Sequence, residues 1–171
     1  MAIKILISGY ENTGKTTLIS KINDALIINC DAKEFSIPVM HTNFNQWDGL
    51  KSFTDFCNDK IVAFKKAKGE LPKFVVIDTI SQLYMQLTRW NSNHFRGFDI
   101  HTQNNTDTLG LNTYFEKLIE KGISVIVVSH TMVDDKTSKH IIPAQGQFQK
   151  VGSFLSIVNE AIFIERSPDV H

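Results

Sequence analysis

Six short stretches of the chain are apolar along most of their length, and their brevity favours strands over helices. They span residues 3–8, 25–30, 37–42, 73–78, 123–128 and 158–165. The third stretch is the weakest, because Pro38 near its start cannot donate a hydrogen bond to a neighbouring strand. Apolar runs without polar alternation are typical of strands covered on both faces of a sheet.

Between these runs, apolar residues recur at steps of three and four, which predicts amphipathic helices. The predicted helices cover residues 15–25, the stretch from a cap at Asp48 to a stop at Gly69, residues 80–90, and residues 107–121. Residues 91–106 are rich in Asn, His and Thr and lack periodicity, so we expect a long loop there. A second polar segment covers residues 131–149.

Alternation of buried strands with helices predicts an α/β fold with a mainly parallel central sheet and helices on both faces. A chain of 171 residues suits one domain. We expect that domain to span residues 1–165, with residues 166–171 as a C-terminal tail that frays.

Charge and composition narrow the classes of function. Lys plus Arg and Asp plus Glu are both 18, so any nucleic-acid binding must come from a local patch, from oligomerisation, or be weak. The only arginines are Arg89, Arg96 and Arg166, which disfavours a metabolite kinase with an arginine-rich lid. Cys30 and Cys57 fit free thiols in a reducing compartment. No apolar stretch approaches the roughly 20 residues that span a bilayer, so we expect a soluble, cytoplasmic protein without a membrane partner.

Residues 9–16 match the pattern G-x-x-x-x-G-K-[ST] and lie between an apolar strand and an amphipathic helix. In such a loop, successive backbone N–H groups surround a phosphate, and glycines permit the close approach. Lys15 would bring positive charge to the β- and γ-phosphates, and the Thr16 hydroxyl would ligate Mg²⁺. The predicted nucleotide-binding residues are Gly9, Tyr10, Glu11, Asn12, Thr13, Gly14, Lys15, Thr16 and Thr17.

A single carboxylate follows four apolar residues at the end of the stretch Phe-Val-Val-Ile-Asp, and it belongs to Asp78. In open α/β sheets, ligands bind outside the carboxyl ends of the strands. Asp78 is therefore our candidate to hold Mg²⁺ together with Thr16, and the alternative is an aspartate that caps the next helix.

Together these motifs resemble a known family. The loop GYENTGKTT and the stretch VVIDTISQL resemble the two nucleotide motifs of RecA-type recombinases, and ISVIVVSH resembles their next core strand. The closing segment IIPAQGQFQKVGSFLSIVNEAIFIE resembles that of small phage-encoded RecA-like ATPases, which include the Sak-type single-strand annealing proteins. The resemblance covers most of residues 3–165. It implies Mg²⁺-dependent ATP hydrolysis, single-stranded DNA as a partner, a homo-oligomer, and the host cytoplasm if a phage encodes the chain.

The resemblance also implies a catalytic acid just after the second strand. When Asp31 is matched to the family's aspartate, the usual glutamate position falls on Lys33, and Glu34 is one residue out of step. We favour Glu34 as the general base, with Asp31 as the alternative. His130, at the end of the strand beside Asp78, is a candidate sensor of the γ-phosphate or else a histidine satisfied by backbone groups. The predicted catalytic residues are Lys15, Glu34, Asp31 and His130.

In that family, DNA contacts come from the segments after these two strands, here residues 89–106 and 131–149. The first holds Arg89, Trp90, His94, Phe95, Arg96 and Phe98, and the second holds Lys136, Lys139, His140 and Lys150 beside Asp134 and Asp135. Rings interleaved with cations suit stacked bases and phosphates, but Trp90 and Phe95 could equally pack on the core. Two other functions stay open: a small-molecule kinase, and a nucleotide-dependent interaction module that does not hydrolyse ATP.

Overall fold

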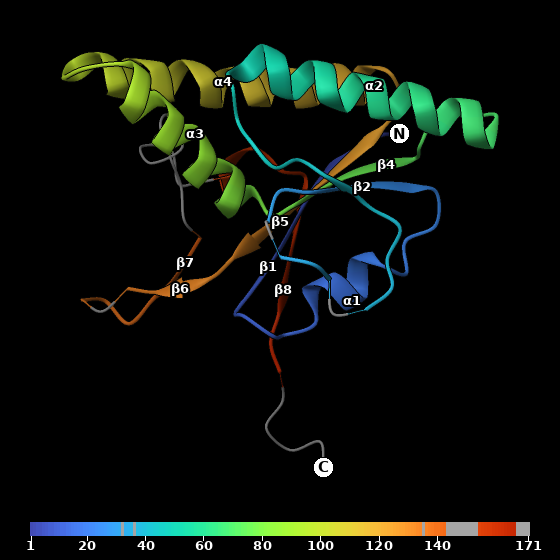
Figure 1. The fold of residues 1–171 in the computed structure, drawn as a ribbon. Helices are drawn as coiled ribbons and strands as arrows, with labels where there is room; N and C mark the ends of the chain where they lie inside the picture. Colours follow the sequence, from blue (N-terminus) through green and yellow to red (C-terminus); the bar gives the residue numbers. More distant parts are fainter. Residues whose placement is uncertain (32, 36, 135, 143–153, 167–171) are drawn as a thin grey trace.

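A parallel six-stranded sheet organises the molecule, in a computed structural model that describes residues 1–31, 33–35, 37–134, 136–142 and 154–166 (Figure 1). The strands are β1 (Lys4–Gly9), β2 (Ala25–Asn29), β3 (Thr42–Asn43), β4 (Phe74–Asp78), β5 (Ser124–His130) and β8 (Glu160–Ile164). Their order across the sheet is β3-β2-β4-β5-β1-β8, and every neighbouring pair is parallel.

Helices cover both faces of this sheet. They are α1 (Lys15–Ile19), α2 (Leu50–Lys68), α3 (Ile80–His94), α4 (Phe98–Glu120) and the 3₁₀ turn η1 (Phe154–Ile157). Figure 1 shows α2, α3 and α4 as a layer on one face and the short α1 on the other. The predicted α/β fold, with a parallel sheet between helices, is confirmed.

The hydrophobic core is divided by the sheet into two unequal parts. The larger cluster joins β-strand side chains such as Ile28 and Val127 to Phe53, Leu83 and Phe115 of the three-helix layer. The smaller cluster lies on the α1 face. Strand side chains therefore meet apolar neighbours on both sides, which is why these strands read as continuous apolar runs.

Two predicted boundaries are wrong near the first part of the chain. The helix predicted over residues 15–25 is only the five-residue α1, because the chain turns at Ser20 and Asp24 adopts a φ of 57°. The strand predicted over residues 37–42 is reduced to β3, which begins beyond Pro38. Proline lacks the N–H that a sheet ladder requires, so pairing starts only after it.

The predicted cap of the next helix is also wrong. Gly49, not Asp48, precedes α2, and the Asp48 carboxylate instead accepts a hydrogen bond from the Trp90 indole N–H at 3.2 Å.

The largest difference from the sequence analysis concerns residues 91–106, predicted as a loop. They are almost entirely helical, since α3 ends at His94 and α4 begins at Phe98. This stretch has no apolar periodicity because polar side chains lie between the two helices. The Asn91 side chain donates to Asn104 at 2.8 Å and to Asp107 at 2.9 Å, and all three residues are buried. Buried polar groups are tolerated when they are hydrogen-bonded, so these residues pack a helix pair without an apolar stripe.

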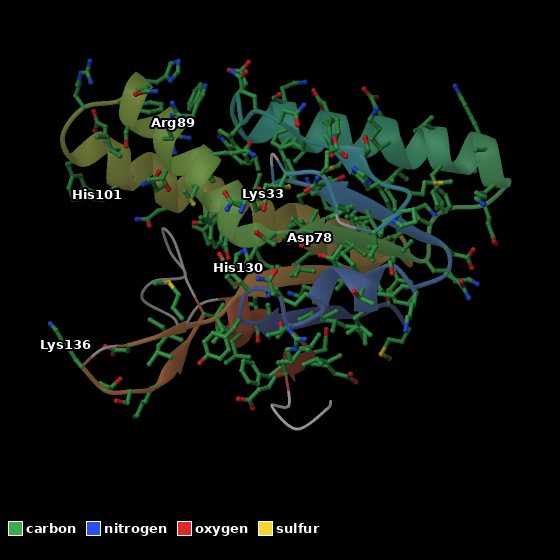
Figure 2. The ribbon with its side chains drawn as sticks, turned by 60° about the horizontal axis from the view of Figure 1, so that its bottom comes forward. Lys33, Asp78, Arg89, His101, His130 and Lys136 are labelled. Atoms are coloured by element: carbon green, nitrogen blue, oxygen red, sulfur yellow. The ribbon has the colours of Figure 1, made fainter. Side chains whose placement is uncertain are left out.

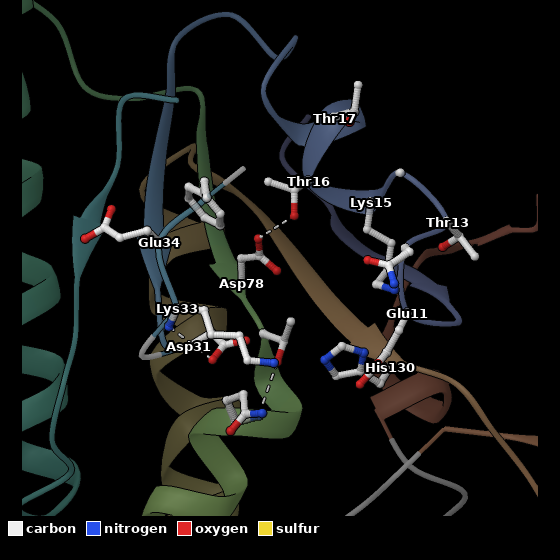
Figure 3. A pocket seen from close by; sticks show the side chains of 15 residues that line it. Glu11, Thr13, Lys15, Thr16, Thr17, Asp31, Lys33, Glu34, Asp78 and His130 are labelled. Carbon is white, nitrogen blue, oxygen red and sulfur yellow. Dashed lines mark hydrogen bonds between the residues drawn. The ribbon is translucent and has the colours of Figure 1, made fainter. Parts of the chain in front are cut away.

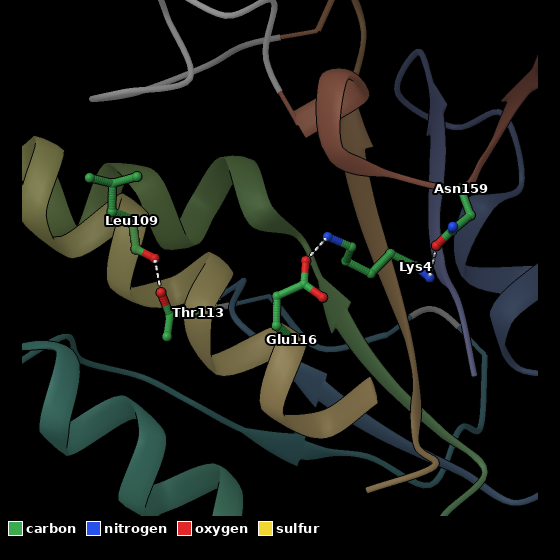
Figure 4. A network of polar contacts seen from close by, with 5 residues as sticks. All are labelled: Lys4, Leu109, Thr113, Glu116 and Asn159. Carbon is green, nitrogen blue, oxygen red and sulfur yellow. Dashed lines mark hydrogen bonds and ion pairs between the residues drawn. The ribbon is translucent and has the colours of Figure 1, made fainter. Parts of the chain in front are cut away.

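Polar contacts also join α4 to β1, and join β1 to the residue that precedes β8 at the other edge of the sheet (Figure 4). The buried Lys4 ammonium forms an ion pair with Glu116 of α4. The backbone of Lys4 accepts from the Asn159 N–H, and its own N–H donates to the Asn159 side chain, both at 2.9 Å. These contacts hold β1, which leads into residues 9–16, in register with β8.

Beyond the sheet, β5 continues into a small antiparallel hairpin of β6 (Met132–Val133) and β7 (His140–Ile141). The hairpin extends away from the sheet, with Lys136 at its outer end (Figures 1 and 2). Within the described ranges, no helix combines the length and apolar character needed to cross a bilayer.

Candidate nucleotide-binding site

A pocket of about 450 Å³ opens at the carboxyl ends of the strands (Figure 3). Its walls come from the loop after β1, the loop after β2, the junction of β4 with α3, and the end of β5. The lining residues are Glu11, Asn12, Thr13, Gly14, Lys15, Thr16, Thr17, Asp31, Lys33, Glu34, Phe35, Asp78, Thr79, Gln82 and His130. The position and size suit a nucleotide, since open α/β sheets bind ligands at this edge.

Residues 9–16 form a compact loop between β1 and α1, as predicted. Gly14 adopts a φ of 95°, a left-handed conformation that glycine takes without strain. Gly9 is closely packed, because a Cβ placed on it would lie 2.5 Å from the carbonyl oxygen of Ile164 on β8. The Thr13 hydroxyl donates to the Tyr10 carbonyl at 2.9 Å and closes the loop on itself.

Lys15 is buried at the base of this loop. Its ammonium donates to the carbonyl oxygen of Gly9 at 2.8 Å and also to that of Tyr10. Burial lowers the pKa of Lys15, while the carboxylates of Asp78 and Glu11 partly oppose that shift. A further negative charge beside this ammonium, such as a phosphate, would favour its charged form more strongly.

Asp78 faces the loop from the end of β4. Its carboxylate accepts a hydrogen bond from the Thr16 hydroxyl at 3.5 Å, and the residue is only 4% exposed. Burial raises the pKa of Asp78 to about 6, while Lys15 opposes the shift. A hydroxyl and a buried carboxylate side by side are oxygen ligands of the kind Mg²⁺ takes beside phosphates, so these two residues fit the predicted metal site.

Both candidate catalytic acids line the same pocket, but they lie differently. In Figure 3, Asp31 lies on the side of Asp78 and His130, whereas the Glu34 side chain extends outward, away from Lys15. Burial is the main cause of the raised pKa of Asp78, and the Asp31 carboxylate adds to it; at His130, whose pKa burial lowers, the same carboxylate partly opposes the shift. Asp31 is the acid nearer to the centre of the site.

His130 lies opposite these acids at the end of β5, beside β4 as predicted. Its backbone N–H donates to the Ser81 hydroxyl at 3.2 Å, and Ser81 also contacts the buried Ser129 hydroxyl at 3.2 Å. Burial, followed by the charge of Lys15, lowers the pKa of His130, so its neutral form is favoured at pH 7. Among the described residues, its buried Nδ1 has no hydrogen-bond partner.

Four further residues line the pocket although no role was predicted for them from the sequence: Lys33, Phe35, Thr79 and Gln82. Thr79 caps α3 by accepting from the Gln82 N–H at 3.2 Å, so the helix begins at the wall of the pocket. In the sequence, Lys33 could have been singled out by its place between Asp31 and Glu34, where it occupies the position of the family's glutamate.

Those predicted DNA-contacting residues that the structure describes do not line the pocket. Trp90 stacks on His94 with ring centroids 4.0 Å apart and packs partly on the larger core cluster. Arg89, Arg96 and Phe98 are exposed near the junction of α3 and α4, and Figure 2 shows Arg89 well apart from His130. Of the residues predicted in the second segment, Lys136 and Lys139 lie on the β6–β7 hairpin. Asp135, Lys150 and the side chain of His140 lie outside the described residues.

A family model described as an AAA domain matches residues 1–168. Among solved structures, the chain is similar to a KaiC-like protein from Pyrococcus horikoshii, with 14% sequence identity and a TM-score of 0.47 over 82% of this chain and 77% of that chain. A search of curated proteins returned no match. The family match includes the phosphate loop, Asp78 and His130. The chain therefore belongs to the AAA-domain family, as a P-loop protein of the nucleoside-triphosphate-binding class.

Proposed function

We propose that the protein is an ATPase that hydrolyses ATP in the presence of Mg²⁺. The observation that carries this proposal is the convergence of the Lys15 ammonium, the Thr16 hydroxyl, the Asp78 carboxylate and a further acid on one pocket of about 450 Å³. Phosphoryl transfer requires mainly positioning and electrostatic stabilisation, and these are the groups that supply both.

Some residues of the pocket bind the phosphates, and others position and activate the attacking water. The backbone of residues 9–16 surrounds the β-phosphate, and Lys15 turns its ammonium from the loop carbonyls to the β- and γ-phosphate oxygens. Thr16 and Asp78 would hold Mg²⁺, which would neutralise charge on the phosphates. An acid accepts a proton from water as the water oxygen bonds to the γ-phosphorus, and the bond from that phosphorus to the β,γ-bridging oxygen breaks.

The geometry supports Asp31 as this acid, although Glu34, one residue out of step with the family's glutamate, was the acid favoured from the sequence. We expect Asp31→Asn to lower kcat by about 100-fold, in the range of lost general-base catalysis. Glu34→Gln, the matched control, should change kcat by less than about threefold, since this side chain extends outward. Phosphate release under single-turnover conditions measures both. The opposite order of effects would assign the base to Glu34.

We further propose that single-stranded DNA is the partner of this ATPase and that the chain works as a homo-oligomer. The support is the exposed cations and rings at the α3–α4 junction, together with Lys136 and Lys139 on the β6–β7 hairpin. With a formal net charge of zero, binding depends on this local patch. We propose a cytoplasmic location, which is the host cytoplasm if a phage encodes the chain. The free, buried thiols of Cys30 and Cys57 are consistent with that location.

The experiment that tests the function is ATP turnover with and without single-stranded DNA, with molecular mass recorded in both states. We expect phosphate release that DNA stimulates at low salt, with stimulation declining as salt rises. Turnover without any response to DNA would remove the partner and leave the ATPase. Tight ATP binding without phosphate release would instead establish a nucleotide-dependent interaction module, which the departure at the glutamate position already favours as the second candidate.

A further inference from the structure

Lys33 is a second cation in the nucleotide pocket. It lines the pocket together with Lys15, although the two residues come from loops after different strands. In Figure 3 its side chain runs into the pocket from the β2 side, toward the region of Asp78 and His130. Among the described residues, the ion pairs are Lys4–Glu116, Lys51–Asp55 and Lys73–Asp24, so the Lys33 ammonium is not engaged with an acid in this set.

The loop that carries Lys33 is anchored at several points. The buried Asn29 at the end of β2 donates from its side chain to the Lys33 carbonyl at 3.2 Å and accepts from the Asp31 N–H at 3.0 Å. One residue earlier, the Cys30 carbonyl accepts from the Gln86 side chain of α3 at 2.9 Å. These contacts hold the backbone of residue 33 at the pocket wall, so only the side chain has to move to reach a ligand.

Lys33 lies on the side of the pocket that a terminal phosphate would occupy. Thr17 marks the α-phosphate side, and Figure 3 shows it at the opposite end of the site from Lys33, Asp31 and His130. The Lys33 charge also acts on His130, whose pKa is lowered first by burial, next by Lys15 and, more weakly, by Lys33. Because His130 is the predicted sensor of the γ-phosphate, a cation that acts on His130 lies on the side where the terminal phosphate is expected.

The formal charges of the pocket explain why the Lys33 cation would affect nucleotide binding. Glu11, Asp31, Glu34 and Asp78 carry formal negative charge there, and of the lining residues that the structure describes only Lys15 and Lys33 carry full positive charge. A nucleoside triphosphate adds further negative charge at the end nearest Asp31. Without Lys33, repulsion between that acid and the terminal phosphate would oppose binding of the triphosphate more than of the diphosphate.

We propose that Lys33 contacts the terminal phosphate of the bound nucleotide, as a cation supplied by the same chain, and that it gives the site its preference for triphosphate over diphosphate. The proposal rests on the proposed ATPase function and names the part of the nucleotide that Lys33 recognises. Lys33 transfers no proton in this role; its ammonium offsets charge on the γ-phosphate oxygens.

The test compares affinities for two nucleotides rather than turnover alone. Dissociation constants are measured with Mg²⁺ for ADP and for the hydrolysis-resistant β,γ-imido analogue of ATP, in wild type, Lys33→Met, Lys33→Arg and Lys66→Met. Lys66 is an exposed residue of α2 outside the pocket and serves as the matched control. Lys33→Met should weaken the triphosphate analogue roughly 10-fold and ADP less than about twofold, the size of a lost charge-assisted contact. Lys33→Arg should recover most of the loss.

Each other outcome overturns the inference in a distinguishable way. Equal weakening of both nucleotides in Lys33→Met would mean that Lys33 only shapes the pocket. Unchanged affinities would mean that its ammonium stays in solvent, and in both cases the proposed ATPase function would stand. Failure of the wild-type protein to bind either nucleotide would remove the proposed function and the role of Lys33 together. Lys33 is exposed, so its variants should fold, and circular dichroism checks this.

Discussion

Replacing Lys15 with Met should weaken binding of Mg-ATP by at least about 100-fold and abolish turnover, because charge-assisted contacts to two phosphates are lost together. The methionine stem occupies the same buried space, but it cannot donate to phosphate oxygens. The fold should persist, since the variant removes a buried ammonium whose contacts in this structure are the loop carbonyls of Gly9 and Tyr10. Calorimetric titration of ATP and ADP measures the effect.

Lys66→Met is the control for this experiment, because it removes the same charge from an exposed site on α2. Its nucleotide affinity should equal that of the wild type. Retention of wild-type affinity in Lys15→Met would contradict the assignment of the pocket, since the loop would then bind phosphate without its ammonium. Unfolding curves in urea show whether any loss of binding reflects loss of structure.

The second large effect is expected from Asp78→Asn, which should lower Mg²⁺-dependent turnover by about 100-fold or more while making the nucleotide-free protein more stable at neutral pH. The carboxylate is 4% exposed, and burial raises its pKa from 3.8 to about 6. Asparagine keeps the shape and can still accept the Thr16 hydrogen bond, but it carries no charge to bind a metal ion. Loss of turnover should therefore coincide with a gain in the free energy of unfolding.

The pH dependence of stability gives this prediction its sign. Below pH 3.8, Asp78 is protonated in both the folded and the unfolded states, so it contributes no difference. Between pH 3.8 and about 6 the unfolded chain releases the proton that the folded protein retains, and stability falls as pH rises. Above about pH 6 the full cost is present, about 3 kcal/mol from the size of the pKa shift.

The measurement is urea unfolding of wild type and Asp78→Asn at pH 4 and pH 7.5, without nucleotide or metal. The variant should gain stability over the wild type at pH 7.5 and much less at pH 4. A variant that is less stable than the wild type at both values would show that Asp78 holds the fold together. Thr79→Ser, which keeps the hydroxyl that caps α3, is a neighbouring control and should show no such pH dependence.

The sequence predicted elements built from apolar runs better than elements held together by polar side chains. Continuous apolar runs located β1, β2, β4 and β5 because strands covered on both faces exclude polar residues, and an apolar run also located β8, although this edge strand is mostly exposed. The junction of α3 and α4 escaped prediction because the hydrogen bonds that Asn91 donates to Asn104 and Asp107 cross the helix pair. Their partners are 13 and 16 residues away in the chain, so no local periodicity reports them.

By itself, the sequence determined the phosphate loop, the aspartate at the end of a buried strand and the parallel α/β class, because each depends on residues that are neighbours in the chain. Only the tertiary structure decided what surrounds those residues. Parallel strands bring the ends of β1, β2, β4 and β5 to one edge, so Asp31 and Lys33 line one pocket with Lys15 and with His130, which follows them by roughly a hundred residues of sequence. The direction of a side chain, such as Glu34 outward and Lys33 inward, follows from backbone contacts to Asn29 and Gln86 that a linear pattern does not encode.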